Sequence, residues 1–361
     1  MGSPIPVGSG VRSRRRSEAR RRTSTLRACL LILVLAALAV GLAGAPAVPA
    51  IRRVVTAPAR HGRARASSEK PAARPSSSAI GLRVLRFVDT TRTIHLQGGR
   101  RLPRTLVTYV RYPALGAPGQ TDVPNAPPAL AGGPYPLVVF GHGFAVTPQI
   151  YARLLQSWAR AGYVVAAPVF PLGSAGAPGG PDEADVINQP TDMSFVISSL
   201  LSQNRPGAGA LAGLIDPAHI AVAGHSDGAE TALAVAYSRR FHDPRVDAAM
   251  IFSGAEISGV GGYGFTRGTP PLLAVQGTAD TFNEPRYTEA YFALAQRPKF
   301  LLRLLGAGHL PPYTDEQPQL GIVERVSVAF LGRYLKQEPA ALARLLMVGA
   351  RRGESALTSD P

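Results

Sequence analysis

A pentapeptide with two glycines places the strongest constraint on how this 361-residue chain can fold. Residues 224–228 read Gly-His-Ser-Asp-Gly; they follow the apolar run 220–223 and precede the helix-forming stretch 229–236. The apolar run is typical of a short buried strand, so the pentapeptide must turn directly from a strand into a helix. A turn this tight brings its backbone against neighbouring elements, which requires glycines two residues to each side of Ser226. The pattern predicts that the Ser226 hydroxyl stands above the edge of a sheet.

Short apolar segments alternate with amphipathic ones from about residue 80 onward. Helices are expected at 149–161, 186–201, 229–236, 286–295 and 321–335, and strands at 82–88, 105–112, 136–140, 163–168, 220–223, 247–252, 271–276 and 300–305. This alternation predicts one α/β domain over residues 80–337, with a mostly parallel sheet of about eight strands and helices on both faces. The tail, 338–361, is expected to begin as a short helix and then fray.

The first 50 residues have the pattern of an export segment. Eight arginines between Arg12 and Arg27 precede the uncharged apolar run 28–44, and small residues follow, with candidate cleavage points after Ala47 and Ala50. The run is long for a signal peptide and barely long enough to span a bilayer, so an uncleaved membrane anchor stays open. In both cases the rest of the chain is expected to be exported and secreted or held in the cell envelope. Residues 51–79, rich in Ala, Pro, Ser and Arg, are predicted to form a disordered linker.

The positive charge of the chain lies mainly in this N-terminal part. The formal net charge is +16, yet residues 1–80 hold 15 Lys and Arg against 2 Asp and Glu, and the remainder holds 24 against 21. The predicted domain is therefore nearly neutral, which argues against nucleic-acid binding. The single cysteine, Cys29, lies in the apolar run, so the domain has no disulfide, thiol nucleophile or thiolate metal site. No metal-ligand spacing or glycine-rich phosphate loop stands out, and we expect no metal and no cofactor.

The pentapeptide has the form of the nucleophile elbow of an α/β-hydrolase fold, in which the serine, an acid and a histidine follow in that order. A serine hydroxyl is a weak nucleophile and needs a base within hydrogen-bond reach. Among the seven histidines, only His309 follows the last predicted strand, in the loop 306–310. We therefore predict that His309 is the base that activates Ser226.

The acid must lie between the nucleophile and the base. Asp280 follows the predicted strand 271–276 and a glycine turn, which places its carboxylate at the carboxyl edge of the sheet, where ligands bind. Its role would be to hold the imidazole tautomer and stabilise the imidazolium. Rival carboxylates are Glu256, Asp243 and Asp247. Asp280 has the best position and is the predicted third member of the triad.

Two backbone amides are predicted to form the oxyanion hole. The first is the N–H of Asp227, directly after the nucleophile. The second is the N–H of Phe144, in the glycine-containing loop 141–144 after an apolar strand. His142 in this loop is expected to brace the loop rather than to take part in the chemistry.

These features together resemble the α/β-hydrolase superfamily over about residues 80–337. Within it, the chain is similar to the serine esterases of the group that contains dienelactone hydrolases, chlorophyllases and platelet-activating-factor acetylhydrolase-like esterases. This resemblance implies ester hydrolysis through an acyl-enzyme on Ser226. Dienelactone hydrolases use a cysteine nucleophile, so that activity is not expected here, and the disulfide of polyester-cleaving relatives is missing. The matching segments are 104–106, 112–114, 141–144, 158–168 and 224–228.

Several aromatic residues lie on loops expected near the carboxyl end of the sheet. Either they pack in the core, or they line a substrate pocket and make the acyl or alcohol group of the ester apolar or lipid-like. The predicted function is an exported serine hydrolase of small-molecule carboxylic esters. An acyltransferase acting on envelope lipids or glycans with the same triad, and a non-catalytic binding protein of the same fold, remain alternatives, and the oligomeric state is open. The candidate pocket residues are Phe144, Phe170, Tyr263, Phe265 and Tyr313.

Overall fold

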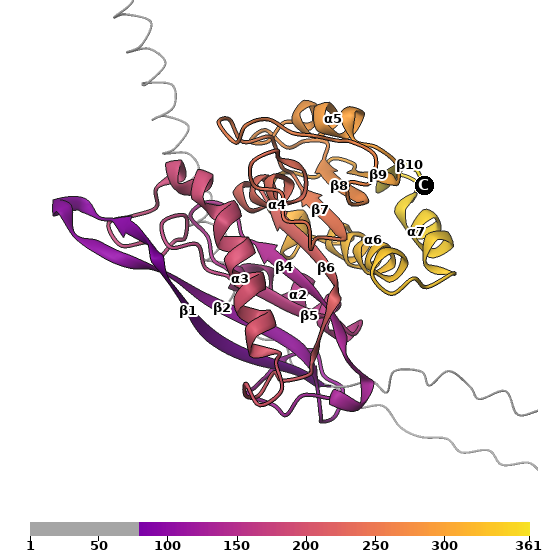
Figure 1. Ribbon diagram of the computed structural model, residues 1–361. Helices are drawn as coiled ribbons and strands as arrows, with labels where there is room; N and C mark the ends of the chain where they lie inside the picture. Colours follow the sequence, from indigo (N-terminus) through magenta and orange to yellow (C-terminus); the bar gives the residue numbers. More distant parts are fainter. Residues whose placement is uncertain (1–78) are drawn as a thin grey trace, which may run out of the picture. The chain divides into compact units, whose positions relative to one another are not determined.

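A ten-stranded sheet forms the centre of the described part of the protein (Figure 1). The structure is a computed structural model that describes residues 79–361. The strand order is β10-β9-β8-β7-β6-β4-β5-β2-β1-β3. The six neighbouring strands from β9 to β5 are parallel, whereas β2 runs antiparallel to β5 and β1, and β10 runs antiparallel to β9.

The strands and helices of residues 79–361 have the following bounds. The strands are β1 (Ala79–His95), β2 (Arg101–Ala114), β3 (Asp122–Pro124), β4 (Tyr135–Gly141), β5 (Val164–Pro168), β6 (Ile215–His225), β7 (Ala248–Phe252), β8 (Leu272–Gly277), β9 (Lys299–Leu304) and β10 (Ser355–Asp360). The α-helices are α2 (Ala152–Arg160), α3 (Gln189–Gln203), α4 (Asp227–Tyr237), α5 (Pro285–Leu294), α6 (Gln319–Tyr334) and α7 (Ala341–Gly349). Short 3-10 helices are η1 (Gln97–Gly99), η2 (Leu130–Gly132), η3 (Pro148–Tyr151), η4 (Glu183–Asn188) and η5 (Pro311–Tyr313).

Helices cover both faces of the parallel strands. On one face, α3, α4 and α5 pack on the sheet, and Ile220 and Val222 of β6 belong to the core cluster that these helices close. On the other face, Phe140 of β4 contacts Trp158 of α2, and the indole N–H of Trp158 donates to Ser327 of α6 at 2.8 Å. Because alternate side chains of one strand are buried on opposite faces, these strands read as continuous apolar runs in the sequence.

The structure confirms the predicted α/β class, with a mostly parallel sheet between helical layers. It has ten strands rather than about eight, because β3 and β10 were not expected. The tail 338–361 begins with a short helix, α7, as predicted, and this helix packs on α6. The prediction that the tail then frays was wrong, because β10 extends the sheet past the predicted boundary at residue 337. The Ser355 hydroxyl donates to the Gly349 carbonyl at 2.9 Å and joins the end of α7 to the start of β10.

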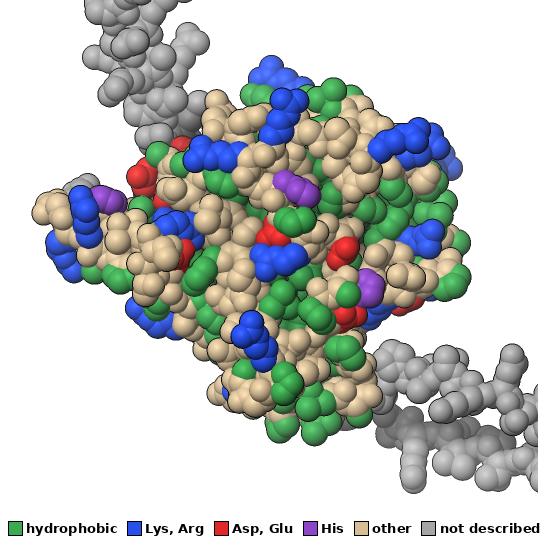
Figure 2. Space-filling model, in the orientation of Figure 1, with side chains coloured by type: hydrophobic (Ala, Val, Ile, Leu, Met, Phe, Trp, Pro, Cys, Tyr) green, Lys and Arg blue, Asp and Glu red, His purple; other side chains and the backbone are tan. Residues whose placement is uncertain are grey.

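The predicted export segment, 1–50, lies outside the described residues. The same is true of the predicted linker 51–79, except for Ala79, which begins β1. Within residues 79–361, no helix has both the length and the apolar character needed to cross a membrane. Lys and Arg side chains stand at separate positions over the face shown in Figure 2, with acidic side chains between several of them.

Candidate active site

Ser226 occupies the turn between β6 and α4 in a strained backbone conformation. Its φ and ψ angles are 55° and −126°, and its amide donates to the carbonyl of Phe252 in β7 at 3.1 Å. A positive φ is unfavourable for a residue with a Cβ and persists only where the surroundings impose it. Here β6 and α4 enter and leave the turn in fixed directions, so the hydroxyl is held above the strand ends.

The glycines of the turn allow three backbones to touch. A Cβ on Gly228 would lie 2.1 Å from the carbonyl oxygen of Gly141 in β4, and one on Gly224 would lie 2.0 Å from the carbonyl oxygen of Gly228. Both distances are far below van der Waals contact. The pentapeptide therefore needs its glycines because β4, β6 and α4 meet there through main-chain atoms.

Gly228→Ala is expected to lower the free energy of unfolding by about 3 kcal/mol, because only backbone atoms surround the new methyl group and overpacked sites relax poorly. Urea unfolding followed by circular dichroism measures this change. Gly176→Ala is the matched control, since a Cβ at Gly176 meets no atom within 4 Å. Equal unfolding midpoints for the two variants would contradict the steric account of the turn.

The structure brings Ser226, His309 and Asp280 together in one hydrogen-bonded chain. The Ser226 Oγ lies 2.9 Å from Nε2 of His309, and Nδ1 of His309 lies 2.7 Å from Oδ2 of Asp280. Since a carboxylate only accepts, Nδ1 carries the proton, and Nε2 is left to accept from the serine hydroxyl. The three residues come from the ends of β6, β8 and β9 and meet at the carboxyl edge of the sheet.

Four donors hold the Asp280 carboxylate. Oδ1 accepts from the amides of Phe282 and Asn283 at 2.9 and 3.1 Å. Oδ2 accepts from the side-chain amide of Gln276 at 3.2 Å as well as from His309. Asp280 is only 3% exposed, so these bonds replace water and fix the oxygen that faces the imidazole.

The rival carboxylates have other partners or positions. Asp243 forms an ion pair with Arg245 at 2.6 Å, and Asp247 accepts from the amide of Ile220 at 2.9 Å. Glu256 is exposed on the loop after β7. Of these four carboxylates, only that of Asp280 forms a described hydrogen bond with His309.

The two predicted oxyanion amides have no competing acceptor in another described residue. The amide of Asp227 is the first of α4, where helical N–H groups have no partner within the helix and favour negative charge. The amide of Phe144 is oriented by its own peptide group: the Gly143 carbonyl accepts from Nδ1 of His142 at 2.8 Å. In a trans peptide the following N–H points the opposite way, so the Phe144 N–H is directed away from His142.

His142 braces this loop with both ring nitrogens. Nε2 accepts from the amide of Phe170 at 3.0 Å, which leaves the proton on Nδ1 for the Gly143 carbonyl. Burial lowers the pKa of His142 to about 4, so the ring is neutral at physiological pH. The loop is also tied to residues 173–175, since the Ala145 amide donates to the Gly173 carbonyl at 2.8 Å.

Three carboxyl groups lie within electrostatic reach of one another beside Ser226. They belong to Asp227, to Glu230 one turn further along α4, and to Glu183 of η4. Burial, with the nearby charge of Glu183, raises the pKa of Asp227 to about 7. Burial and the charge of Asp227 also raise the pKa of Glu230. The first turn of a helix stabilises a carboxylate by about 0.3–2 kcal/mol, which is less than the cost of burying an unpaired carboxylate.

Asp227→Asn is expected to change how stability depends on pH. The folded-state pKa lies above the ordinary value of 3.8, so the free energy of unfolding of the wild type falls as the pH rises from about 4 through about 7. The variant lacks this loss and should exceed the wild type by about 1–3 kcal/mol at pH 8, with near equality at pH 4. Urea unfolding at pH 4, 6 and 8 tests this. Parallel profiles for the two proteins would refute it.

The five aromatic residues predicted to line a pocket divide into two groups according to their burial. Phe170 and Tyr313 are fully buried, which corrects their prediction as pocket residues. The Tyr313 hydroxyl lies 2.9 Å from the Ser253 hydroxyl, and the ring stacks on Phe252, so it supports the site from the core. Phe170 packs on His142 with ring centroids 5.0 Å apart.

The other three predicted pocket residues are partly exposed. Tyr263 and Phe265 stack on each other on the loop after β7, and the Tyr263 hydroxyl accepts from the Ile257 amide at 3.0 Å. Phe144, in the oxyanion loop, is also partly exposed. Sequence reasoning missed Phe282, whose ring centroid lies 5.3 Å from that of His309. Its position two residues after the predicted acid was the available signal.

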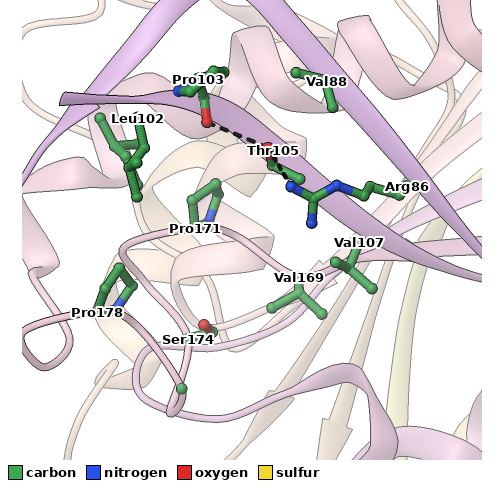
Figure 3. Close-up of a pocket in the computed structure, with 12 residues that line it drawn as sticks. Arg86, Val88, Leu102, Pro103, Thr105, Val107, Val169, Pro171, Ser174 and Pro178 are labelled. Carbon is green, nitrogen blue, oxygen red and sulfur yellow. Dashed lines mark hydrogen bonds between the residues drawn. The ribbon is translucent and has the colours of Figure 1, made fainter.

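A pocket of about 430 Å³ lies beside the oxyanion loop and not in the triad itself (Figure 3). Its walls are the β1–β2 hairpin and the loop after β5, and Pro171, Pro178 and Val107 face it with Arg86 and Thr105 at one side. The lining is mainly apolar and includes Ser174, whose neighbour Ala175 donates its amide proton to the carbonyl of Val146, two residues after Phe144, at 3.2 Å. The pocket contains no member of the triad.

Comparisons with known proteins agree with this geometry. A family model described as Chlorophyllase matches residues 123–283, a range that holds the elbow and Asp280. The solved structure of a ferulic acid esterase from Streptomyces cinnamoneus aligns with a TM-score of 0.59 and 21% sequence identity, covering 80% of this chain and 98% of that chain. In all, 1040 chains of solved structures match, so the fold is widespread and does not by itself identify a substrate. No curated protein matches the sequence significantly.

The described domain therefore has the α/β-hydrolase fold. The family match, together with this fold, confirms the predicted resemblance to the serine esterases of the superfamily. It also supports the predicted enzyme class, a carboxylic ester hydrolase.

Proposed function

We propose that this protein hydrolyses small-molecule carboxylic esters through an acyl-enzyme on Ser226. The observation that carries the proposal is the hydrogen-bonded chain from Asp280 through His309 to Ser226, with distances of 2.7 and 2.9 Å. A serine becomes a useful nucleophile only when a base can take its proton, and here an oriented base lies within reach.

Acylation follows from the positions of the protons. His309 Nε2 takes the hydroxyl proton while Oγ of Ser226 attacks the ester carbonyl, and Asp280 stabilises the resulting imidazolium. The carbonyl oxygen becomes an oxyanion that accepts from the amides of Phe144 and Asp227. Because these amides are already oriented, they stabilise the transition state without reorganisation. The tetrahedral intermediate then collapses, and Nε2–H of His309 protonates the departing alcohol.

Deacylation uses the same groups with water as the nucleophile. Neutral His309 takes a proton from water as the water oxygen attacks the acyl carbonyl. The second tetrahedral intermediate releases the acid, and the proton returns to Oγ of Ser226. The carboxyl edge of the sheet thus needs no group beyond those described to complete a hydrolytic cycle.

The substrate is proposed to be an ester with an apolar or aromatic group. Phe144 stands in the oxyanion loop and Phe282 packs on His309, so aromatic side chains approach the reacting atoms from two loops. The similarity to a ferulic acid esterase makes hydroxycinnamate esters a suitable first test. We place methyl ferulate beside p-nitrophenyl acetate, butyrate and octanoate in the panel.

Stopped-flow release of p-nitrophenol tests the mechanism directly. An acyl-enzyme that forms faster than it decays gives a burst whose amplitude matches the enzyme concentration. A fluorophosphonate probe should label the protein, and peptide mass spectrometry should locate the label on Ser226. Absence of both ester turnover and labelling would reject the proposal. Adding an alcohol acceptor and analysing products separates hydrolysis from acyl transfer.

We also propose that the catalytic domain is exported. The arginine-rich segment before the apolar run 28–44 supports this, and an uncleaved run would attach the protein to the membrane. Cell fractionation combined with intact mass of the mature protein tests both points. A full-length protein recovered only from the cytoplasm would reject export.

A further inference from the structure

His225, the residue before the nucleophile, connects the two halves of the catalytic site. Its Nδ1 lies 2.8 Å from the hydroxyl of Tyr151, and its Nε2 lies 2.8 Å from the main-chain carbonyl of His309. The same Tyr151 hydroxyl accepts from the amide of Gly143 in the oxyanion loop at 3.3 Å. A continuous chain therefore runs from the oxyanion loop through Tyr151 and His225 to the backbone of the catalytic base.

The direction of every bond in this chain is fixed by the groups at its ends. The amide of Gly143 can only donate, so the Tyr151 oxygen accepts from it and uses its single proton toward Nδ1 of His225. The carbonyl of His309 can only accept, so Nε2 of His225 carries the proton. One neutral tautomer of His225 satisfies all the groups, and an imidazolium would lose the bond from Tyr151.

The surroundings keep the ring in this form. His225 is 2% exposed and lies against the rings of Tyr151, Tyr313 and His309, with centroids 5.6, 4.8 and 4.7 Å away. Burial, with the neighbouring charge of His309, lowers the pKa of His225 well below its ordinary value. Burial also raises the pKa of Tyr151, which keeps the proton that the chain requires. No second positive charge therefore opposes the imidazolium that forms on His309.

We propose that His225 is a positioning residue that, together with Tyr151, holds the oxyanion loop and the catalytic His309 in fixed relation to each other. This inference rests on the proposed hydrolytic function. The hydrogen-bonded chain reaches the amide of Gly143, the residue before Phe144, at one end and the backbone carbonyl of His309 at the other, so it sets the separation of oxyanion donor and base. A Cβ on Gly143 would lie 3.3 Å from both Nδ1 of His225 and Cβ of Ser226, which shows how closely these parts approach.

Three single variants test this hydrogen-bonded chain by single-turnover acylation with p-nitrophenyl butyrate. Tyr151→Phe removes the hydroxyl, His225→Leu removes both ring nitrogens, and His225→Gln keeps an acceptor and a donor separated much as the two ring nitrogens are. Labelling with the fluorophosphonate probe to completion counts the competent sites, and release of p-nitrophenol in a single turnover with enzyme in excess gives the acylation rate constant of those sites. This separates misplacement of catalytic groups from partial unfolding.

The acylation rate constant is expected to fall about 10-fold in Tyr151→Phe and about 100-fold in His225→Leu, since small misplacements of reacting groups are costly. The substrate dissociation constant, taken from the concentration dependence of the acylation rate, should change by less than about 3-fold, because binding of the ground state is not altered. His225→Gln should recover most of the lost rate. The double variant Tyr151→Phe/His225→Leu should be no slower than His225→Leu, because both changes break the same chain.

Two results would overturn the inference. The first is a reduced fraction of sites labelled by the fluorophosphonate probe with an unchanged acylation rate constant, which is the outcome of a merely structural role. The second is an additive loss in the double variant, which would mean that the two residues act independently. The wild-type burst and fluorophosphonate label test the underlying function separately: if they are present and the variants match the wild type, only the positioning role fails.

Discussion

Ser226→Ala should reduce kcat for p-nitrophenyl butyrate by about 10⁵–10⁶-fold, since loss of the nucleophile disables the triad as a unit. In the described part of the chain, the Ser226 hydroxyl is the one that bonds to Nε2 of His309, so no neighbouring alcohol replaces it. The amides of Phe144 and Asp227 are unchanged by the substitution. A residual rate about 10³-fold above the reaction in water is therefore expected, because these donors still stabilise an oxyanion formed by attacking water.

The control for this prediction is Ser198→Ala on α3. The Ser198 hydroxyl donates to the Ser194 carbonyl at 3.0 Å within its own helix, and its loss should leave kcat within about 2-fold of the wild type. Thermal unfolding of Ser226→Ala should show a folded protein, because serine and alanine both carry a Cβ at the strained φ. Turnover of Ser226→Ala within 100-fold of the wild type, in enzyme free of contaminating esterase, would show that another group is the nucleophile.

The positions of the elbow and of the hydrogen-bonded residues Ser226, His309 and Asp280 could be predicted because the forces that define them are local or topological. Gly224 is required by contact with the backbone of Gly228 within the turn, and Gly228 is required by contact with the backbone of Gly141 at the end of the adjacent strand β4. Both contacts are fixed by the strand-to-helix geometry, so they leave a fixed spacing in the sequence. His309 could be found because only one histidine follows the last parallel strand, and the ends of parallel strands share one edge. The parallel sheet could be predicted because each central strand carries apolar side chains on both faces and therefore forms a continuous apolar run in the sequence.

Other features depend on contacts between distant parts of the chain. The Tyr151–His225 bond joins residues 74 positions apart, and the bond from His225 to the His309 carbonyl spans 84. In the sequence, Phe170 and Tyr313 cannot be distinguished from aromatic residues that line a pocket. Only tertiary packing decides that their side chains are buried. β10 was missed because its residues, Ser-Ala-Leu-Thr-Ser-Asp, have little strand character, and pairing with β9 creates the strand.

Asp280→Asn should lower kcat by about 10⁴-fold while the site keeps its geometry, because the substitution selects the wrong tautomer of His309. Oδ1 of Asp280 accepts from two backbone amides, at 2.9 and 3.1 Å, so the carbonyl oxygen of an asparagine must take this position. The NH₂ group then faces Nδ1 of His309 and can only donate to it. The imidazole proton moves to Nε2, which can no longer accept from Ser226.

The opposite orientation of the asparagine side chain is unfavourable, because its NH₂ group would then face the backbone N–H groups of Phe282 and Asn283 with no acceptor between them. Asp243→Asn is the matched control, because it removes a buried carboxylate that pairs with Arg245 at 2.6 Å and not with His309. This variant should lose some stability but keep kcat within about 3-fold of the wild type. Steady-state kinetics with p-nitrophenyl butyrate should show an unchanged KM for Asp280→Asn. If Asp280→Asn keeps kcat within 10-fold of the wild type, the carboxylate does not orient the base, and the hydrogen bond between Asp280 and His309 has only a structural role.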